Sequence, residues 1–356
     1  MRLPYPVIDG DSHVLEPRDL WLQRLEEPFR PQAPQFRLTP EGKELFYIDG
    51  KWQKRVPFEG NVWEDRPRGG FDPHERLRVM DALGIDQTFL YPTLGLNLAA
   101  VENVPLAAAL CRAYNDWLAD YCRVAPQRLF GVAALNLEEP REAIREAQRV
   151  VATHGVKAVM IRPNPSRGRC LHHPDYEPFY AALADLGVAL AVHEGTTGTM
   201  PTAGIDRFDN NFFFEHLFSH PFEQQLAFAS FLAGGILERH PTLRVAFLEA
   251  GTAWVPYWLH RLDEHYEGIG WMVPELRQPP SEYFRRQGWV SCEPDDALLP
   301  HLLPLIGEDK VMFSTDYPHY DAKPEPVKLF LELALPETAR RRILGENAAR
   351  FYGLTT

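Results

Sequence analysis

Six polar residues stand at the ends of short apolar runs, and their types are those that bind metal ions or transfer protons. The first run, Val7 to His13, ends in Asp11 and His13, and later runs end in the residues Arg162, His193, Glu249 and Asp316. Side chains two residues apart on a β-strand point to the same face, so Asp11 and His13 converge on one point. Two imidazoles with carboxylates suit Zn²⁺, Mn²⁺ or Fe²⁺, whereas Mg²⁺ and Ca²⁺ prefer oxygen ligands alone.

The elements that must position these residues alternate between strand and helix. Eight strands are predicted, at Val7–His13, Ile85–Pro92, Leu129–Leu135, Val156–Arg162, Val188–His193, Arg244–Glu249, Gly288–Cys292 and Lys310–Asp316. Helices are predicted from Asp72 to Gly84, and then at Pro105–Val124, Pro140–Thr153, Tyr176–Leu186, Pro221–Glu238, Gly251–His265, Glu325–Leu333 and Pro336–Tyr352. With right-handed crossovers this is an α/β fold, a (β/α)8 TIM barrel with an extra C-terminal helix. We expect residues 1–356 to form a single domain.

Two segments interrupt the alternation. Residues 15–71 form an insertion after the first strand, in which Asp49-Gly50, a dipeptide typical of tight type I′ turns, predicts a hairpin between 44–48 and 51–56. Residues 194–220 are predicted to form a long polar and aromatic loop after the fifth strand. The substrate specificity of the protein is expected to reside in these two segments.

The barrel prediction brings the polar strand ends together. Barrel active sites lie at the carboxyl ends of the strands, where the loops between strand and helix meet. An unpaired carboxylate buried after an apolar run is costly, and a cation at the mouth of the barrel would remove that cost. The residues at these strand ends, Asp11, His13, His193, Glu249 and Asp316, are of the types that bind such a cation.

Each of these residues also has a plainer structural interpretation. Asp11-Ser12-His13 is compatible with a turn cap, His193 with a hydrogen-bonded core histidine, and Asp316 before Tyr317-Pro318 with a turn. Glu249 is compatible with an ion pair to Arg162. The metal interpretation is favoured because strands one, five and eight all end in ligand types.

Other polar residues are candidates for supporting roles. Arg162, His220 and His319 are predicted to bind substrate, and Glu194 and Glu293 to orient an imidazole or arginine. His240 precedes the sixth strand, at the opposite end of the barrel, and is predicted to be structural. The remaining loop histidines are weaker candidates, at His172, His173 and His216.

Composition limits the class of protein. The net charge of −12 argues against a nucleic acid or an anionic membrane as partner, because both need a basic surface. No apolar run reaches the roughly 18 residues of a membrane span, and no signal pattern precedes the first strand. The four cysteines have no C-x-x-C spacing, which predicts reduced thiols and a cytoplasmic protein.

These motifs together resemble one family. Asp9-Gly10-Asp11-Ser12-His13, His193, His240-Pro241 and Ser314-x-Asp316-Tyr317-Pro318-His319 resemble the amidohydrolase-related metal-dependent barrels, in the branch that includes aminocarboxymuconate-semialdehyde, resorcylate and carboxyvanillate decarboxylases. The resemblance implies one divalent ion held by Asp11, His13, His193 and Asp316, and a homodimer or larger homo-oligomer. Asp11 matches the acidic variant of the first ligand, which implies Mn²⁺ as well as Zn²⁺, and Glu249 replaces a common histidine.

Two reactions fit this constellation equally. In hydrolysis, the ion lowers the pKa of a bound water and Asp316 takes its proton. In non-oxidative decarboxylation, Asp316 or Glu249 delivers a proton to the carbon that loses CO2. The expected substrate is a small carboxylate or carbonyl compound, aromatic or unsaturated. The alternative is a catalytically inactive barrel that serves as a binding or interaction protein.

Overall fold

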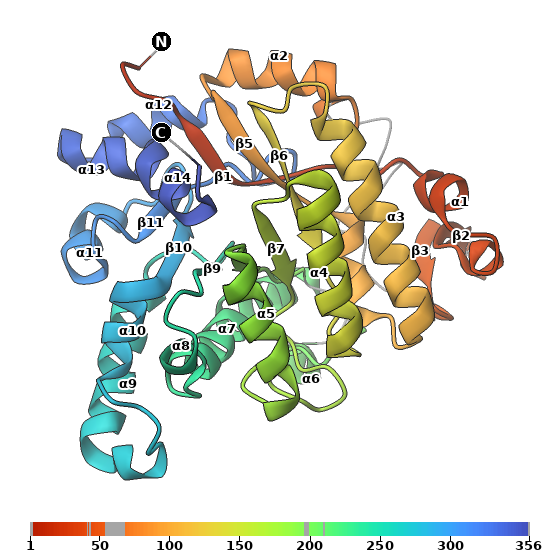
Figure 1. Cartoon of the computed structure of the whole chain (residues 1–356). Helices are drawn as coiled ribbons and strands as arrows, with labels where there is room; N and C mark the ends of the chain where they lie inside the picture. The colour runs from red at the N-terminus through yellow and green to blue at the C-terminus, as the bar shows by residue number, and fades with distance from the viewer. Residues whose placement is uncertain are drawn as a thin grey trace.

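Eight parallel strands form the centre of the protein, at the eight predicted positions (Figure 1). The computed structural model describes residues 3–40, 42, 44–53, 68–195, 199–208 and 211–354. In sheet order the strands are β1 (Ile8–His13), β5 (Gln87–Tyr91), β6 (Leu129–Ala134), β7 (Ala158–Ile161), β8 (Ala189–Val192), β9 (Val245–Phe247), β10 (Gly288–Cys292) and β11 (Val311–Phe313). Strands β7, β8, β9 and β11 are buried along their whole length, as expected when both faces of a sheet are covered.

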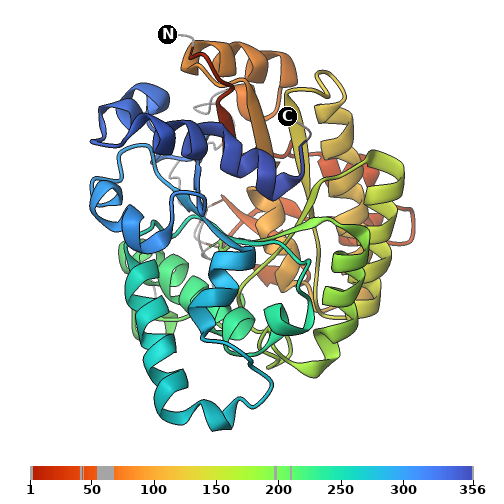
Figure 2. The same ribbon diagram turned by 60° about the vertical axis from the view of Figure 1, so that its left-hand side comes forward.

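The first and last strands meet and close the sheet into a barrel. The backbone amides of Thr315 and Asp316 donate to the carbonyl of Asp11, at 3.3 and 3.1 Å, and the amide of His13 donates to the carbonyl of Tyr317 at 2.6 Å. The Asp9 carboxylate strengthens this seam, because it accepts hydrogen bonds from the amide and hydroxyl of Thr315 at 3.0 and 2.5 Å. Figure 2 shows the C-terminal helices beside the N-terminal strand.

Helices surround the barrel. They include α2 (Pro73–Leu83), α3 (Val104–Cys122), α4 (Pro140–His154), α5 (Glu177–Leu186), α9 (Trp254–Ile269), α10 (Pro280–Gln287), α11 (Leu299–Ile306) and α12 (Pro326–Glu332). The predicted ends of α2 are confirmed, since the Asp72 carboxylate caps the amides of His74 and Glu75, and Gly84 ends the helix with φ of 77°. Helices α10 and α11, which flank β10, were not among the predicted elements.

The segment predicted as a loop from 194 to 220 is largely helical, so this prediction was wrong. Helix α6 covers Ile205–Phe208, and α7 runs from Phe212 to Leu232 with Pro221 inside it. Pro221 resembled a helix start because proline favours the first turn, but the Asn211 side chain caps the helix earlier by accepting from the amide of Phe213 at 3.2 Å. Gly235, with φ of 76°, separates α7 from the short α8 (Ile236–Arg239).

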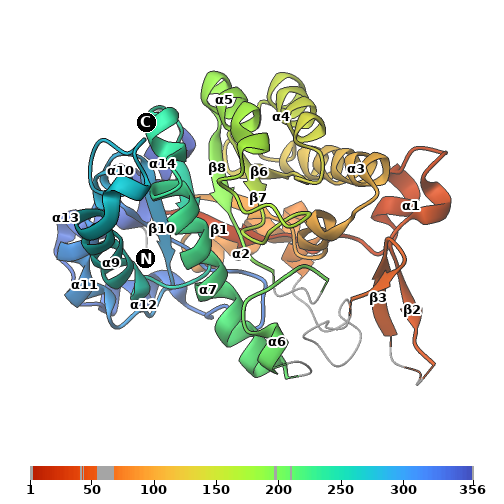
Figure 3. The same ribbon diagram turned by 90° about the horizontal axis from the view of Figure 1, so that it is seen from below.

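The insertion after β1 carries a small antiparallel sheet to one side of the barrel (Figure 3). It consists of β2 (Gln35–Leu38), β3 (Glu44–Ile48) and β4 (Lys51–Trp52), after the short helix α1 (Leu20–Arg24). Asp49 and Gly50 both have positive φ, at 49° and 75°, which confirms the predicted tight turn between β3 and β4. Residues 54–56 of the predicted hairpin lie outside the described residues.

The C-terminal helical segment, Glu337–Tyr352, covers the predicted span Pro336–Tyr352 but is less regular than predicted. Helix α13 (Glu337–Arg341) continues through a π-helical turn, Arg342–Glu346, into α14 (Asn347–Tyr352).

All four cysteines are free, and Cys170 alone of them is exposed. None of the helices in the described ranges is long and apolar enough to cross a membrane.

Candidate active site at the carboxyl ends of the strands

The barrel brings the predicted strand-end residues to one point. Asp11 and His13 lie in the last three residues of β1, whereas His193 and Asp316 follow β8 and β11. The Nε2 atom of His13 lies 3.2 Å from Asp316 Oδ1 and 3.8 Å from Asp11 Oδ1, and the Nε2 atom of His193 lies 3.5 Å from Asp11 Oδ1. Glu249 joins them from the end of β9, with Oε2 at 3.1 Å from His193 Nε2.

Backbone carbonyls orient both histidines. The Nδ1 atom of His13 lies 2.8 Å from the carbonyl oxygen of Pro92, and that of His193 lies 2.5 Å from the carbonyl oxygen of Glu194. Because a carbonyl oxygen only accepts, Nδ1 carries a proton in each ring, and Nε2 is the atom that faces the carboxylates. A second hydrogen bond of this kind is the usual support for a metal-binding histidine.

Several atoms at this point are buried without a hydrogen bond to any described residue. They are Asp11 Oδ1, His13 Nε2, His193 Nε2, Glu249 Oε2 and Asp316 Oδ2. Each such polar atom costs about 1–3 kcal/mol when it is buried without a partner. Asp11, His13 and His193 form one group of possible metal ligands, and His13, Glu249, Asp316 and His319 form another, with the ligand atoms of each group within 4.8 Å of one another. The described residues thus contain a His/Asp/Glu group able to hold one metal ion.

The backbone is strained at two of the acidic residues. Glu249 and Asp316 have φ of 52° and 54°, a left-handed conformation that non-glycine residues rarely adopt. Such strain costs about 1–3 kcal/mol and persists where the surroundings enforce it, often at functional sites. Here hydrogen bonds hold both backbones in place. The amide of Glu249 donates to the Ser291 hydroxyl at 3.0 Å, and the amide of Asp316 donates to the carbonyl of Asp11 at 3.1 Å.

The charges at this point shift several pKa values. Burial, together with His319 and His193, holds the pKa of His13 well below its usual value. Burial also opposes protonation of His193, but the carboxylates of Asp11 and Glu249 raise its pKa to about 10. Burial and the neighbouring Glu249 and Asp321 carboxylates raise the pKa of Asp316 well above its usual value. Without a cation, protons thus offset the charge of the carboxylates.

Three further histidines line the site. His319 Nδ1 lies 2.7 Å from Asp316 Oδ1, and its ring lies over that of His13 with centroids 4.0 Å apart. His220 Nδ1 lies 3.0 Å from the carbonyl oxygen of Glu249. The His216 ring lies 4.5 Å from that of His220, one turn away on α7. The structure thus places the predicted substrate residues His220 and His319 beside the candidate ligands.

Arg162 lies in the wall of the site and is paired. Its Nη2 atom donates to Glu194 Oε2 at 2.7 Å, and Nη1 donates to the carbonyl of Leu96 at 3.1 Å. Both side chains of the ion pair are almost fully buried. Glu194 therefore holds an arginine, one of the two supporting roles considered for it. The Arg162–Glu249 ion pair that was the structural alternative does not occur among the described interactions.

The remaining predicted histidines lie away from the site. His240 contacts Glu177 Oε1 at 2.7 Å, and His172 contacts the Ser230 hydroxyl at 3.1 Å. His173 caps a short 3₁₀ turn by accepting from the amide of Asp175. All three therefore have local structural partners.

The sequence analysis missed an outer layer of polar residues. Asp9 supports the seam, and the Glu16 carboxylate accepts from the amides of Thr93, Leu94 and Gly95 at 3.2, 2.9 and 2.8 Å. Thr93 in turn contacts His319 Nε2 at 2.9 Å. Of these residues, only Asp9 could have been predicted to lie near the site, because it precedes Asp11 by two residues in the same strand and side chains so spaced point to the same face.

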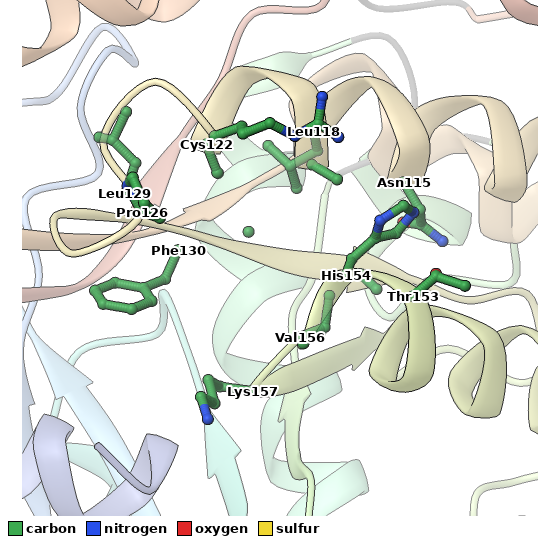
Figure 4. A pocket seen from close by; sticks show the side chains of 15 residues that line it. Asn115, Leu118, Cys122, Pro126, Leu129, Phe130, Thr153, His154, Val156 and Lys157 are labelled. Atoms are coloured by element: carbon green, nitrogen blue, oxygen red, sulfur yellow. The ribbon is translucent and has the colours of Figure 1, made fainter. Parts of the chain in front are cut away.

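Two cavities distinguish the two ends of the barrel. A small cavity of about 50 Å³ adjoins the candidate site and is lined by five carboxylates, those of Asp11, Glu249, Glu293, Asp316 and Asp321. A pocket of about 290 Å³ lies near the amino-terminal ends of β6 and β7, where Leu118, Phe130, His154 and Val156 line it (Figure 4). The second pocket shares no residue with the candidate site.

A parallel eight-stranded barrel with a metal-binding group at its carboxyl end defines a class of barrel enzymes, and the comparisons agree. The chain belongs to the amidohydrolase family, whose model matches residues 8–354. This confirms the predicted family, fold and enzymatic class, as opposed to a binding protein.

Among curated proteins, the chain is 26% identical over 314 residues to 2-amino-3-carboxymuconate-6-semialdehyde decarboxylase from Dictyostelium discoideum, covering 88% of this chain and 82% of the relative. It is 27% identical over 335 residues to gamma-resorcylate decarboxylase from Rhizobium sp. (strain MTP-10005), and this match covers 88% of this chain and 97% of the relative. Among solved structures, an amidohydrolase from Mycobacterium avium subsp. paratuberculosis K-10 superposes with a TM-score of 0.85 at 25% identity, covering 99% of both chains. The relatives therefore share nearly the whole barrel.

Proposed function

We propose that this protein is a divalent-metal-dependent enzyme that removes CO2 from a small aromatic or unsaturated carboxylate without an oxidant. The observation that carries the proposal is the set of buried, unpartnered atoms on Asp11, His13, His193 and Asp316, together with the family. The curated relatives support the reaction, because both carry the name of a decarboxylase that acts on such a carboxylate.

The donor set indicates which ion these residues would hold. Two imidazole nitrogens and two carboxylates suit Zn²⁺ or Mn²⁺. When bound, the ion would act as a Lewis acid on an oxygen of the substrate.

The residues around Asp316 provide the proton that decarboxylation consumes. The Thr93 hydroxyl donates its one proton to the carbonyl of Val14 at 2.7 Å, so it can only accept from His319 Nε2. With Nε2 protonated, a single further proton lies between His319 Nδ1 and Asp316 Oδ1. This shared proton is the one we assign to the substrate carbon as its bond to CO2 breaks, and the carboxylate is replaced by hydrogen.

The other site residues are proposed to shape the environment of the substrate. His220 and His319 are proposed to contact it, and Glu249 is proposed as a second acid/base group beside His193. Arg162 is already engaged by Glu194 and Leu96, so we assign it to the wall of the site. We retain the proposals of a homo-oligomer and a cytoplasmic location.

One observation favours hydrolysis of a neutral carbonyl compound as the second candidate. Five carboxylates line the cavity, and Lys323, the one basic residue in its lining, pairs with Asp295 at 2.9 Å. A carboxylate substrate would meet this negative charge, whereas a lactone or amide would not.

The two candidates are separated by their products. The purified protein, loaded with Zn²⁺ or Mn²⁺, is incubated with panels of hydroxybenzoates and of lactones and amides, while CO2 and acid release are followed. CO2 release that disappears after chelation and returns with metal supports decarboxylation. Acid release from lactones or amides alone would establish hydrolysis, and a protein that holds far less than one metal ion per chain would contradict both.

A further inference from the structure

Glu249 directs its two carboxylate oxygens toward two different groups of histidines. Oε2 lies 3.1 Å from His193 Nε2 and 3.9 Å from His13 Nε2, in the group described above. Oε1 lies on the side of α7, 3.4 Å from His220 Nδ1. The carboxylate therefore lies between the candidate metal ligands and a second pair of imidazoles.

This second pair, His216 and His220, has the spacing of a helical metal-binding pair. Residues four apart lie on the same face of a helix, and two histidines so spaced bind a metal ion together in helical zinc motifs. One nitrogen of each ring and one oxygen of Glu249 lie within 4.8 Å of one another. For a common ion at distances of about 2.0–2.2 Å, His220 would bind through Nε2, because its Nδ1 lies 3.0 Å from the carbonyl oxygen of Glu249.

The charge around the site is larger than one divalent cation offsets. Of the residues that line the adjoining cavity, Asp11, Glu249, Glu293, Asp316 and Asp321 are acidic, and Lys323 is the one basic residue. Lys323 pairs with Asp295 at 2.9 Å, outside this set. Like charges at such short range repel one another strongly in a poorly solvated site, and a second cation would reduce this repulsion.

We propose that His216, His220 and Glu249 form a second divalent-cation site, and that Glu249 bridges it to the ion held by Asp11, His13, His193 and Asp316. The inference rests on the proposed function, because Glu249 would join the four ligands of the first ion through Oε2. In this centre Glu249 and His220 bind metal in place of the acid/base and substrate roles proposed for them above. In two-metal centres of enzymes the ions lie about 3.5–4 Å apart, a distance that one carboxylate spans. The proposed centre would thus contain two ions per chain.

The test uses the whole chain and Mn²⁺ alone. The protein is stripped with a chelator, reloaded with excess Mn²⁺ and desalted, and its metal content is measured by elemental analysis together with its electron paramagnetic resonance spectrum. We expect two Mn²⁺ per chain and the multiline signal of two coupled ions. This measurement needs no variant and is therefore independent of any effect of substitution on folding.

A variant then locates the second ion. His216→Ala combined with His220→Ala is expected to lower the content from two Mn²⁺ to one and to replace the coupled signal by that of an isolated ion. The matched control, His260→Ala with His265→Ala, removes two exposed histidines of α9 and should keep two ions. Circular dichroism checks that each variant is folded.

The outcomes separate this inference from the proposed function. One uncoupled Mn²⁺ per wild-type chain overturns the second site and leaves the first intact. No bound Mn²⁺, and none with Zn²⁺, overturns both. Two ions that persist in the His216→Ala/His220→Ala variant overturn the assignment to these histidines.

Discussion

The Nδ1 atom of His319 lies 2.7 Å from the Oδ1 atom of Asp316, three residues earlier in the segment that follows β11. His319 donates its Nε2 proton to the Thr93 hydroxyl, whose own proton goes to the carbonyl of Val14. A single proton therefore remains between His319 Nδ1 and Asp316 Oδ1. Asp316 is thus both a candidate metal ligand and the holder of a proton, and its pKa is raised well above its usual value by burial and by Glu249.

Replacement of Asp316 by Asn should remove the proton and weaken the metal site. Because a positioned acid/base group contributes about 10²–10⁴-fold to rate, we expect Asp316→Asn to lower turnover by at least that factor. The circular dichroism spectrum should be unchanged. Asp295→Asn, at a half-exposed carboxylate that pairs with Lys323, is the control and should retain activity within about twofold. Near-normal turnover in Asp316→Asn would remove this residue from the mechanism.

Metal binding should weaken at low pH. The pKa of His193 is raised to about 10 in the metal-free protein, so binding of a cation near neutral pH displaces a proton from this imidazole. The apparent association constant is then expected to fall at least tenfold for each pH unit between pH 8 and 6. Competition with a chelator of known affinity for Mn²⁺ measures this slope. An affinity that does not change with pH would mean that His193 is neutral before the ion binds.

Glu16 should make stability depend on pH. Burial raises its pKa from 4.5 to about 7, so the folded state binds a proton more tightly than the unfolded state does. Stability from this group is complete below pH 4.5 and is lost as the pH rises toward 7, by about 3 kcal/mol at most. Urea titrations of the wild type and of Glu16→Gln measure the difference. The variant should lose this part of the pH dependence, and an unchanged curve would contradict the assignment.

The buried pair of Arg162 and Glu194 should affect stability more than substrate binding. Removal of one partner leaves a buried charge, so Arg162→Leu is expected to cost about 3–5 kcal/mol. The double variant Arg162→Leu/Glu194→Leu should recover part of that loss. Urea denaturation measures both. A single variant that keeps its stability but shows a greatly raised KM would instead identify Arg162 as a substrate clamp.

The sequence predicted the barrel and the inner residues because both follow from local patterns. Each strand is a short apolar run, and Asp11, His13, His193, Glu249 and Asp316 interrupt or follow such runs at the end where a barrel has its site. The order of the strands then determines which residues meet, without any knowledge of side-chain contacts.

The outer layer and helix α7 could not be predicted in this way. Thr93 contacts His319 across 226 residues of sequence, and nothing near Thr93 indicates such a partner. At α7 the local signals conflicted, since Pro221 favours a helix start whereas the Asn211 cap lies before an apolar run rich in phenylalanine. The tertiary structure decided in favour of the earlier start, and so placed His216 and His220 on adjacent turns.

The seam between the first and last strands has a consequence for biosynthesis. Asp11 and His13 leave the ribosome first among the candidate ligands, and Asp316 leaves last, about 300 residues later. The carbonyl of Asp11 finds its partners, the amides of Thr315 and Asp316, only when β11 has formed. A nascent chain that stops short of β11 therefore has Asp11 and His13 without Asp316 beside them, and the centre is completed only after β11 has been synthesised.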